Sequence, residues 1–346
     1  MMSLTAVYKM YKTSYHTADL SHYSFLITGG AGFIGSNLVE YLLKYHARKI
    51  RVLDNLSTGH MRNIHGFLSN TTFEFVQGDI RNYETCQAAT ADMDYVLHQA
   101  ALGSVPRSIV DPLTTHEVNI SGFLNMLMAV KESSVKRMVY AASSSTYGDS
   151  IALPKVEDKI GNPLSPYAVT KYVNELYAKV FAHTYKMELI GLRYFNVFGP
   201  RQDPNGAYAA VIPKFVNQLL RHQSPVINGD GNHSRDFTFI ENVVQANMLA
   251  LFVQGPEAIN SVYNVALGEQ TSLNQLVQTI KKYLSETDSA IAGIPVIHGP
   301  NRDGDIPHSL ASIEKARKNL GYSPKYNFTE GLRLAVQWYK DNDRGL

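Results

Sequence analysis

Several features that stabilise or localise other proteins are scarce in this sequence. The 346 residues include one cysteine, so no internal disulfide can form, and we predict a reducing, cytoplasmic setting. No apolar run reaches the roughly eighteen residues that a membrane span needs. The net charge of +2 is too small to favour a nucleic acid or a membrane surface as partner. The 12 histidines are scattered without ligand spacing, so we predict no metal site.

The composition is otherwise that of an ordinary globular protein, with 45% hydrophobic and 18% charged residues. A chain of this length can bury a large core without a disulfide or a metal. Residues 1–21 form a leader in which charged residues interrupt every apolar stretch, unlike a secretory signal. We expect this leader either to drape over the following domain or to be partly disordered.

After the leader, short apolar runs alternate with longer helical patterns. Strands are predicted at 23–28, 50–53, 73–76, 95–98, 137–142 and 189–194, and helices at 35–45, 115–133 and 167–185. This alternation predicts an α/β fold, a Rossmann-type doubly wound parallel sheet with right-handed crossovers.

Beyond residue 196 the pattern becomes irregular and rich in turns, which predicts a smaller, interleaved C-terminal substrate-binding domain. We assign residues 22–195 to the cofactor-binding domain, with a later contribution from about 238–268. Residues 196–237 and 269–346 are assigned to the substrate-binding region. No linker separates the two parts, so we expect the site to lie in the cleft between them.

A glycine-rich turn between the first strand and the first helix predicts a dinucleotide site. In Thr-Gly-Gly-Ala-Gly-Phe-Ile-Gly, Gly29 permits a sharp turn, Gly32 lets a pyrophosphate approach the backbone, and Gly35 lets the helix pack against the sheet. Asp54 ends the second strand, where a carboxylate accepts ribose hydroxyls and repels a 2′-phosphate, so NAD is favoured over NADP. Asp79 follows the third strand, where an adenine edge would lie.

A second constellation has the residue types needed for proton transfer. Tyr167 and Lys171 are four residues apart on a predicted helix and therefore share a face. A nearby ammonium favours the phenolate, so we expect the pKa of Tyr167 to be lowered. Ser143, Ser144 and Ser145 follow a predicted strand, at the edge of a parallel sheet where ligands bind. Alone, a Tyr-x-x-x-Lys pair is usually a surface pair, and the serines could simply satisfy a turn.

Together these motifs resemble the extended short-chain dehydrogenase/reductase family. The resemblance rests on the glycine-rich turn, His98-Gln-Ala-Ala101, the serine run before Tyr147-Gly148, Tyr167-x-x-x-Lys171 and Leu192-Arg-Tyr-Phe-Asn196, in this order. It extends from about residue 24 to the end and is closest to UDP-glucose and UDP-N-acetylglucosamine 4-epimerases. The leader is extra to the usual start of the family.

The resemblance implies an epimerase with tightly held NAD. Tyr167 takes the proton of the 4-hydroxyl with support from Ser143 and Ser144, and the C4 hydride passes to NAD and returns to the other face of a 4-keto sugar. The implied cofactor-binding residues are Gly29, Gly32, Phe33, Ile34, Gly35, Asp54, Asn55, Ser57, Gly59, Asp79, Ile80, Gln99, Ala100, Ala101, Tyr167, Lys171 and Tyr194. The implied UDP-sugar-binding residues are Gly103, Ser104, Arg107, Ser143, Ser144, Ser145, Tyr167, Asn196, Ala210, Val211, Lys214, Phe215, Asn228, Arg235, Arg302, Asp305 and Ser309.

Within the second set, Arg235 and Arg302 match the two arginines that pair with the diphosphate, as expected from bidentate guanidinium–phosphate bonding. Asp305 matches the acid that holds a uridine ribose hydroxyl. Four residues later, glucose-restricted relatives have a bulky tyrosine where this sequence has Ser309. A small residue leaves room for an N-acetyl group at C2, so we expect interconversion of UDP-GlcNAc and UDP-GalNAc, with weaker activity on UDP-Glc and UDP-Gal.

Three alternatives stay open at this stage. A 4,6-dehydratase needs an Asp-Glu pair, where this chain has Ser144 and Ser145. A UDP-N-acetylglucosaminuronic acid 4-epimerase would use the same machinery, and Arg107 could pair with its carboxylate. A non-catalytic NAD-binding sensor is disfavoured by the intact set of Ser143, Tyr167 and Lys171.

Family members commonly form dimers through the helix that carries the tyrosine. We therefore expect a homodimer here, built on an apolar stripe that packing against the core would also explain. The stripe consists of Val173, Leu176, Tyr177, Val180 and Phe181.

Overall fold

A computed structural model describes residues 10–205, 209–300 and 307–342 of the chain. Its centre is a seven-stranded sheet in the order β3-β2-β1-β4-β5-β6-β11, in which every neighbouring pair is parallel. The strands are β1 (Ser24–Thr28), β2 (Lys49–Asp54), β3 (Phe73–Gln77), β4 (Tyr95–His98), β5 (Arg137–Ser143), β6 (Leu189–Tyr194) and β11 (Val262–Val265). This order and direction confirm the predicted Rossmann-type sheet. The strands could be predicted because they are buried on both faces and are therefore largely apolar.

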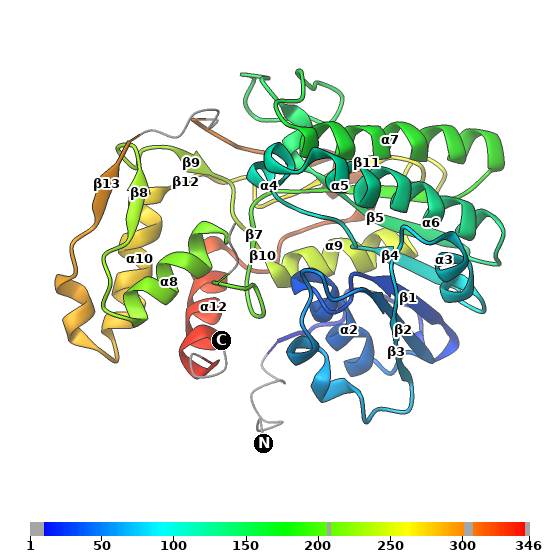
Figure 1. Cartoon of the computed structure of the whole chain (residues 1–346), viewed down its shortest axis with the longest axis horizontal. Helices are drawn as coiled ribbons and strands as arrows, with labels where there is room; N and C mark the ends of the chain where they lie inside the picture. The colour runs from blue at the N-terminus through cyan, green and yellow to red at the C-terminus, as the bar shows by residue number, and fades with distance from the viewer. Residues whose placement is uncertain (1–9, 206–208, 301–306, 343–346) are drawn as a thin grey trace.

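Helices cover both faces of this sheet (Figure 1). One core cluster joins the sheet to α2 (Phe33–Lys44) and α9 (Ile240–Phe252). A second cluster joins the other face to α3 (Tyr83–Thr90), α6 (Gly122–Lys131) and α7 (Pro166–Tyr185). Strand β11 comes from the region expected to return to the cofactor-binding domain, and it lies at the sheet edge beside β6.

One predicted helix is wrong in detail. The pattern at 115–133 indicates a single helix, but the chain forms α5 (Pro112–His116), one π-helical turn (Glu117–Ser121) and α6. The π turn contains Asn119, whose side-chain amide bonds both backbone groups of Leu102. Hydrophobic periodicity does not detect the one extra residue that such a turn inserts.

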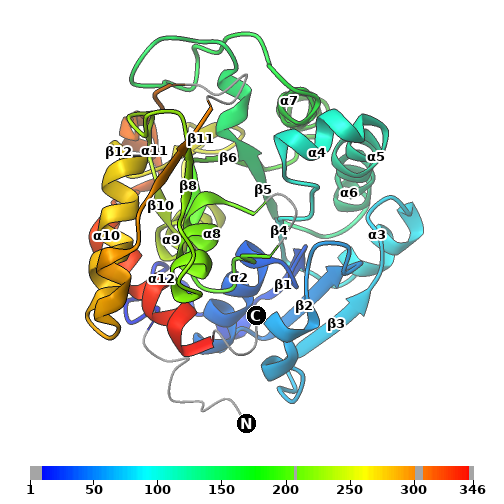
Figure 2. The ribbon, with the colours of Figure 1, turned by 60° about the vertical axis from the view of Figure 1, so that its left-hand side comes forward.

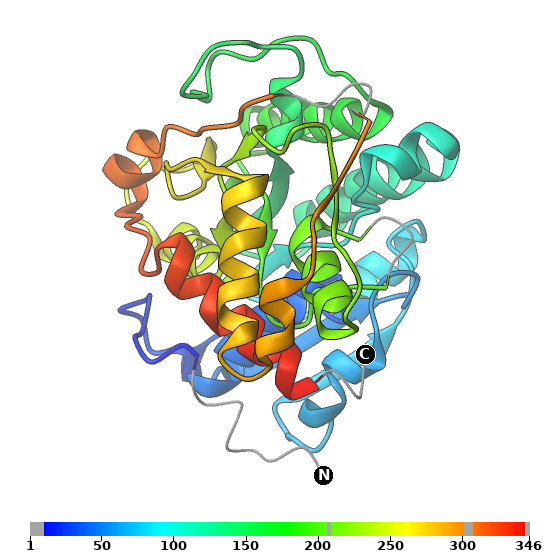
Figure 3. The same ribbon diagram turned by 90° about the vertical axis from the view of Figure 1, so that its left-hand side faces the viewer.

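The C-terminal region builds a smaller layer beside the carboxyl ends of the strands (Figures 1 and 2). Its helices are α8 (Val211–Leu220), α10 (Leu273–Ser285), α11 (Glu314–Leu320) and α12 (Phe328–Asn342). Three two-stranded pairs accompany them: β7 (Val197–Phe198) with β10 (Thr238–Phe239), β8 (Val226–Asn228) with β13 (Ile297–Gly299), and β9 (Ser234–Arg235) with β12 (Thr271–Ser272). Figure 3 shows α8, α10 and α12 side by side, and the large apolar core cluster continues into them.

The described part of the leader drapes over α2 and α9. Tyr11 and Tyr15 are buried, and the Tyr11 amide and the Tyr15 hydroxyl both donate to Oε1 of Glu241, at 3.0 and 2.8 Å. The Tyr11 hydroxyl donates to Asn37 in α2 at 2.7 Å. These bonds anchor the segment, because a buried carboxylate left without donors is costly.

No helix within the described ranges is long and apolar enough to cross a membrane. Over the same ranges, no three side chains of histidine, cysteine, aspartate or glutamate are grouped so that they could hold a metal ion.

Candidate active site

The glycine-rich turn forms a tight cradle at the carboxyl end of β1. Gly29 has a φ of +69°, and a Cβ at this position would lie 2.7 Å from the backbone nitrogen of Ala100. A Cβ at Gly35 would lie 2.2 Å from the carbonyl oxygen of Gly29, so α2 packs directly on the turn. A Cβ at Gly32 would meet only that oxygen, at 3.1 Å. The backbone around Gly32, Phe33 and Ile34 therefore leaves the N-terminus of α2 open for a phosphate.

Asp54 lies at the end of β2 and is only 8% exposed. Its two carboxylate oxygens accept hydrogen bonds from the amides of Ala31 at 2.9 Å and Leu56 at 2.8 Å. Burial raises the pKa of Asp54, and these two hydrogen bonds oppose the rise. A Cβ at Gly59 would lie 2.9 Å from Asp54 Oδ2, so only a glycine lets the loop pass this close. The fixed carboxylate retains lone pairs for ribose hydroxyls.

Asp79, Asn55 and Arg81 form a cluster beyond β3. Asn55 donates to Asp79 Oδ2 at 2.8 Å, and Arg81 donates to both carboxylate oxygens. The Arg81 hydrogen bond is the main reason that the pKa of Asp79 falls to about 2. Asn55 also accepts from the amide of Ser57 at 3.0 Å. The side chain of Ile80 packs into the core, and its carbonyl accepts from Asn125 Nδ2 at 2.9 Å and from the Cys86 thiol at 3.2 Å.

A polar cluster joins β4, β6 and α9 near the centre of the sheet. The Tyr194 hydroxyl donates to Gln99 Oε1 at 3.2 Å, and Asn247 Nδ2 donates to the Tyr194 hydroxyl at 3.0 Å. Asn247 is fully buried and was not predicted, because the sequence of α9 does not show which of its amide side chains faces Tyr194. The adjoining Ala100 and Ala101 are small and lie at the same edge.

The serine run directly follows β5. Ser143 is the last residue of the strand, and its hydroxyl accepts from the amide of Ser145 at 3.1 Å and from its hydroxyl at 2.9 Å. Ser144 begins a short 3-10 turn and is partly exposed. Ser143 and Ser145 therefore satisfy the turn through bonds to each other. Ser143 also forms a hydrogen bond with Tyr167 on α7.

Tyr167 and Lys171 lie on α7 beside this run, as their spacing predicts. The Lys171 ammonium lies 6.0 Å from the centre of the Tyr167 ring and donates to the carbonyl of Ala141 at 2.8 Å. Burial raises the pKa of Tyr167, and a hydrogen bond with Ser143 opposes this rise. Burial also lowers the pKa of Lys171 to about 8, against the effect of Glu175. The prediction that the pKa of Tyr167 is lowered is thus wrong for the protein without ligands. Burial of the phenol raises the pKa, because desolvation disfavours the charged phenolate.

Asn119 is a further residue of this site that sequence reasoning missed. It is 2% exposed, accepts from the amide of Leu102 at 2.8 Å, and donates to Thr170 in α7 at 3.1 Å. It therefore connects the loop after β4 to the helix that carries Tyr167. The only sequence signal is a polar residue within an apolar helix pattern.

His98, at the end of β4, is a packed and hydrogen-bonded residue of the interior. It is 4% exposed, and its Nδ1 lies 2.8 Å from the hydroxyl of Thr28. Burial, together with the charge of Lys171, lowers the pKa of His98 to about 3. The imidazole is therefore neutral at physiological pH and adds no charge to the site.

The segment that contains Ser309 lies against β9. The Ser309 amide donates to the carbonyl of Ser234 at 3.1 Å, which places it beside Arg235. Arg235 donates to the carbonyls of Ser234 at 2.9 Å and Pro307 at 3.2 Å. Asn196 donates to the carbonyl of Asp236 at 3.0 Å, so it belongs to the same group. The structure thus brings three predicted substrate residues together.

The remaining predicted substrate residues lie on several elements. Gly103 and Ser104 precede α4 (Val105–Val110), which carries Arg107, and Ser104 caps that helix. Ala210 caps α8, on which Val211 is partly exposed and Lys214 exposed, whereas the Phe215 ring is 1% exposed and packs in the core. Asn228 ends β8 and is exposed. Arg302 and Asp305 lie outside the described residues.

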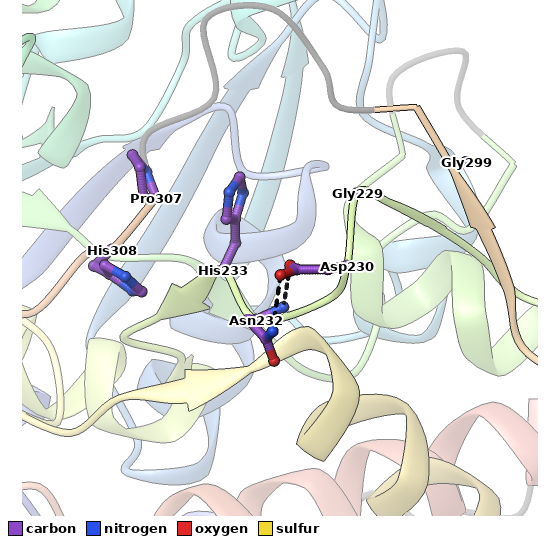
Figure 4. Close-up of a pocket in the computed structure, with 7 residues that line it drawn as sticks. All are labelled: Gly229, Asp230, Asn232, His233, Gly299, Pro307 and His308. Carbon is purple, nitrogen blue, oxygen red and sulfur yellow. Dashed lines mark hydrogen bonds between the residues drawn. The ribbon is translucent and has the colours of Figure 1, made fainter.

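A pocket of about 530 Å³ opens between the β8–β9 loop and the segment that precedes Ser309 (Figure 4). The residues that line it are Gly229, Asp230, Asn232, His233, Gly299, Pro307 and His308. The His308 ring is fixed by a 2.8 Å contact with the Ser234 hydroxyl, and Asn232 donates to Asp230. The pocket adjoins Asn228, Arg235 and Ser309, three of the predicted substrate residues, whereas none of its own lining residues is among them.

Comparison with known proteins now identifies the family. The model of the GDP-mannose 4,6 dehydratase family matches residues 26–335. A putative UDP-glucose 4-epimerase of Methanocaldococcus jannaschii is 38% identical over 92% of this chain and 99% of its own. The chain is a member of the extended short-chain dehydrogenase/reductase family, in its UDP-sugar 4-epimerase branch.

Two solved 4-epimerases of this family share the fold. The UDP-N-acetylglucosamine 4-epimerase of Methanobrevibacter ruminantium M1, in complex with UDP-N-acetylmuramic acid, is 39% identical with a TM-score of 0.84, over 92% of this chain and 99% of that one. The UDP-glucuronic acid 4-epimerase of Bacillus cereus, in complex with UDP-glucuronic acid and NAD, is 30% identical with a TM-score of 0.82 over the same shares. These two members of the family are thus solved with different UDP-sugars.

Proposed function

We propose that this epimerase binds NAD and interconverts UDP-GlcNAc and UDP-GalNAc at C4. The observation that carries the choice of sugar is Ser309, a small residue beside Arg235 on the wall of the predicted sugar site. Tyrosine at this position would fill the space that an N-acetyl group at C2 requires. The similarity to a UDP-N-acetylglucosamine 4-epimerase supports the same choice.

The residues of the cradle fit NAD. Gly32 and the first residues of α2 offer bare amides to a pyrophosphate, and the Asp54 carboxylate is held where ribose hydroxyls would lie. Asp79 and Asn55 would meet the adenosine end, and Tyr194 and Gln99 would lie along the dinucleotide. When bound, NAD supplies a hydride acceptor that later returns the hydride.

The protein groups perform the proton transfer. Tyr167 takes the proton of the sugar 4-hydroxyl, and Ser143 holds the same oxygen by a hydrogen bond. The Ser143 hydrogen bond opposes the desolvation that raises the Tyr167 pKa. The ammonium of Lys171, on the same face of α7, is the positive charge that would favour the phenolate during the reaction. The same residues return the proton after the sugar has presented its other face, so the stereocentre is inverted.

Two other activities on the same scaffold are distinguishable. Ser144 and Ser145 lack the acid and base that a 4,6-dehydratase requires, although the matching family model is named for a dehydratase. A hexuronic acid substrate would differ at C6, where Arg107 on α4 is the candidate partner for its carboxylate. A direct comparison of substrates decides between the acetylated sugar and the uronic acid.

The test is a side-by-side assay of UDP-GlcNAc, UDP-Glc and UDP-GlcNAcA without added coenzyme. Ser309→Tyr is expected to lower kcat/KM for the acetylated sugars at least about tenfold and to spare UDP-Glc, because the added ring excludes only the larger substituent. Ser309→Ala is the matched control, since it removes the hydroxyl but keeps the space. Equal loss on all three substrates in Ser309→Tyr would reject Ser309 as the determinant of sugar choice.

We also propose that the enzyme is a homodimer built on α7. A surface formed by α4, α5 and α7 exposes six large aliphatic side chains between 45% and 77%: Ile109, Val110, Leu113, Val169, Leu176 and Val180. Phe181 of the predicted stripe belongs instead to the core. A contiguous group of exposed aliphatic side chains favours a protein partner, here a second copy of the chain. The double variant Leu176→Glu with Val180→Glu is expected to be monomeric, as measured by light scattering. An unchanged mass would reject this surface as the interface.

A further inference from the structure

A buried ion pair lies one helical turn beyond Lys171. Glu175 on α7 and Arg193 on β6 are 8% and 3% exposed. Arg193 donates from Nε to Oε1 at 2.8 Å and from Nη2 to Oε2 at 2.7 Å, a bidentate geometry. Apolar residues of similar volume often stabilise a core as well as such a pair does. Such apolar residues would lack the negative charge that Glu175 places one turn from Lys171 on α7.

The pair lies directly behind the groups that transfer the proton. Tyr167, Lys171 and Glu175 are spaced by four residues and so share one face of α7. Arg193 pairs in register with Ala142 of β5, the residue before Ser143. The ion pair therefore joins α7 to the sheet next to the serine that contacts the phenol.

Glu175 is the charge that stabilises the Lys171 ammonium. Lys171 is 4% exposed and donates to one carbonyl, so burial lowers its pKa to about 8, and Glu175 opposes this fall. Three ionisable groups from other elements interact with these two residues: His98 on β4 with Lys171, and Tyr140 on β5 and Arg193 on β6 with Glu175. His98 and Tyr140 are neutral near pH 7, because burial lowers the pKa of the former and raises that of the latter.

Arg193 in turn satisfies both oxygens of the Glu175 carboxylate, since a buried charge without such a partner is costly. Its third hydrogen bond, from Nη1 to the carbonyl of Glu157 at 2.9 Å, fixes the guanidinium from the opposite side. The Tyr147 ring packs 4.8 Å from the guanidinium carbon. Arg193 is thus held in place by groups outside α7.

We propose that Glu175 and Arg193 are positioning residues of the epimerase: the pair fixes α7 on the sheet and keeps Lys171 charged and seated beside Tyr167. This inference rests on the proposed function only in taking Tyr167 as the proton acceptor. It requires no particular sugar.

The experiment measures the dependence of kcat on pH with whichever UDP-hexose the wild-type enzyme epimerises best. Glu175→Gln preserves shape and hydrogen bonding but removes the charge, so the Lys171 pKa should fall by about one unit or more. We expect the alkaline limb of the profile to move to lower pH by the same amount. At pH values above the limb kcat should be about tenfold lower than in the wild type, whereas near pH 6 it should change little. Arg193→Lys keeps the charge pair and should shift the limb less.

A second readout does not depend on turnover. The Lys171 ammonium is titrated by the NMR chemical shifts of its side-chain carbons in the protein as purified, with Lys171→Arg to assign the signals. Glu175→Gln should lower the titration midpoint, because the carboxylate no longer favours the ammonium. A wild-type enzyme that epimerises no UDP-hexose would refute the proposed function, whereas this titration would still test the ion pair.

Two further variants control for folding. Glu40→Gln makes the same change in another buried ion pair, in which Arg201 Nη2 lies 2.6 Å from Glu40 Oε2. Because Glu40 lies on α2 and not beside Lys171, the variant should leave the pH profile unchanged. Glu175→Leu with Arg193→Met removes both charges while filling the volume, so no unpaired ion destabilises the fold. This double variant should show the same shifted limb. A folded double variant with the wild-type profile and titration would overturn the proposal, as would loss of folding in both Glu175 variants, which would make the pair structural only.

Discussion

Adding a single methyl group at two glycines of the cradle should separate protein stability from cofactor binding. At Gly35 the new Cβ would lie 2.2 Å from the Gly29 carbonyl oxygen and 2.7 Å from the Gly30 Cα, both backbone atoms that no rotamer can move. At Gly32 the φ of −78° suits alanine, and the closest atom would be 3.1 Å away. The two positions therefore differ in what surrounds them inside the protein.

For Gly35→Ala, α2 must move away from the turn, which costs about 1–3 kcal/mol as overpacking. Helix propensity returns up to about 1 kcal/mol, because alanine is the better helix former. We expect a net loss of roughly 1–2 kcal/mol, or a fall in Tm of a few degrees. NAD content should fall with it, because the turn is displaced.

For Gly32→Ala, the unliganded protein should lose less than about 1 kcal/mol, since alanine at an N-cap is only modestly worse than glycine. The methyl group instead occupies the approach of the pyrophosphate, so NAD affinity should fall at least about tenfold, or ~1.4 kcal/mol. Thermal unfolding with and without added NAD, together with the NAD content of the purified protein, measures both effects. Wild-type stability of Gly35→Ala, or normal NAD binding by Gly32→Ala, would refute the assignment of roles.

Three further predictions test other parts of the site. Tyr167→Phe should lower kcat by about 10²–10⁴, because it removes the proton acceptor, while the unfolding midpoint in urea stays near that of the wild type. His98→Gln should reduce the loss of unfolding free energy on acidification. The folded-state pKa of His98, about 3, lies below its usual value, so this part of the wild-type stability is complete above about pH 6.5 and falls by about 2 kcal/mol between pH 7 and pH 5. An equal slope in both proteins would exclude His98 as its source. Tyr11→Phe leaves Asn37 without its buried donor and should cost about 1–3 kcal/mol in chemical denaturation, and no change would show that the leader does not stabilise α2.

Local sequence signals predicted the sheet and the central motif pairs well. The predicted strands lie within a residue or two of those observed, because a strand buried on both faces must be apolar throughout. Tyr167 and Lys171 share a helix face because the spacing of four residues requires it. Gly29, Gly32 and Gly35 were predictable because their roles follow from backbone geometry alone.

The residues that sequence reasoning missed depend on contacts between distant segments. Asn119 acts through a π turn and through Leu102, and Asn247 acts through Tyr194 on another strand. The pKa of Tyr167 likewise depends on how deeply the ring is buried, which its spacing from Lys171 does not reveal.

The sequence by itself determined the kind of fold, the glycine-rich turn proposed to hold the cofactor, and the shared helix face of the proposed proton-transfer pair, because these follow from periodicity and from backbone conformation over a few residues. Only the tertiary structure decided which charges face one another. Glu175 and Arg193 are 18 positions apart, and nothing in the sequence pairs them, yet packing α7 on β6 removes both from water and holds the carboxylate one helical turn from Lys171. The physical reason is that electrostatic free energies depend on burial and distance, and folding alone sets both.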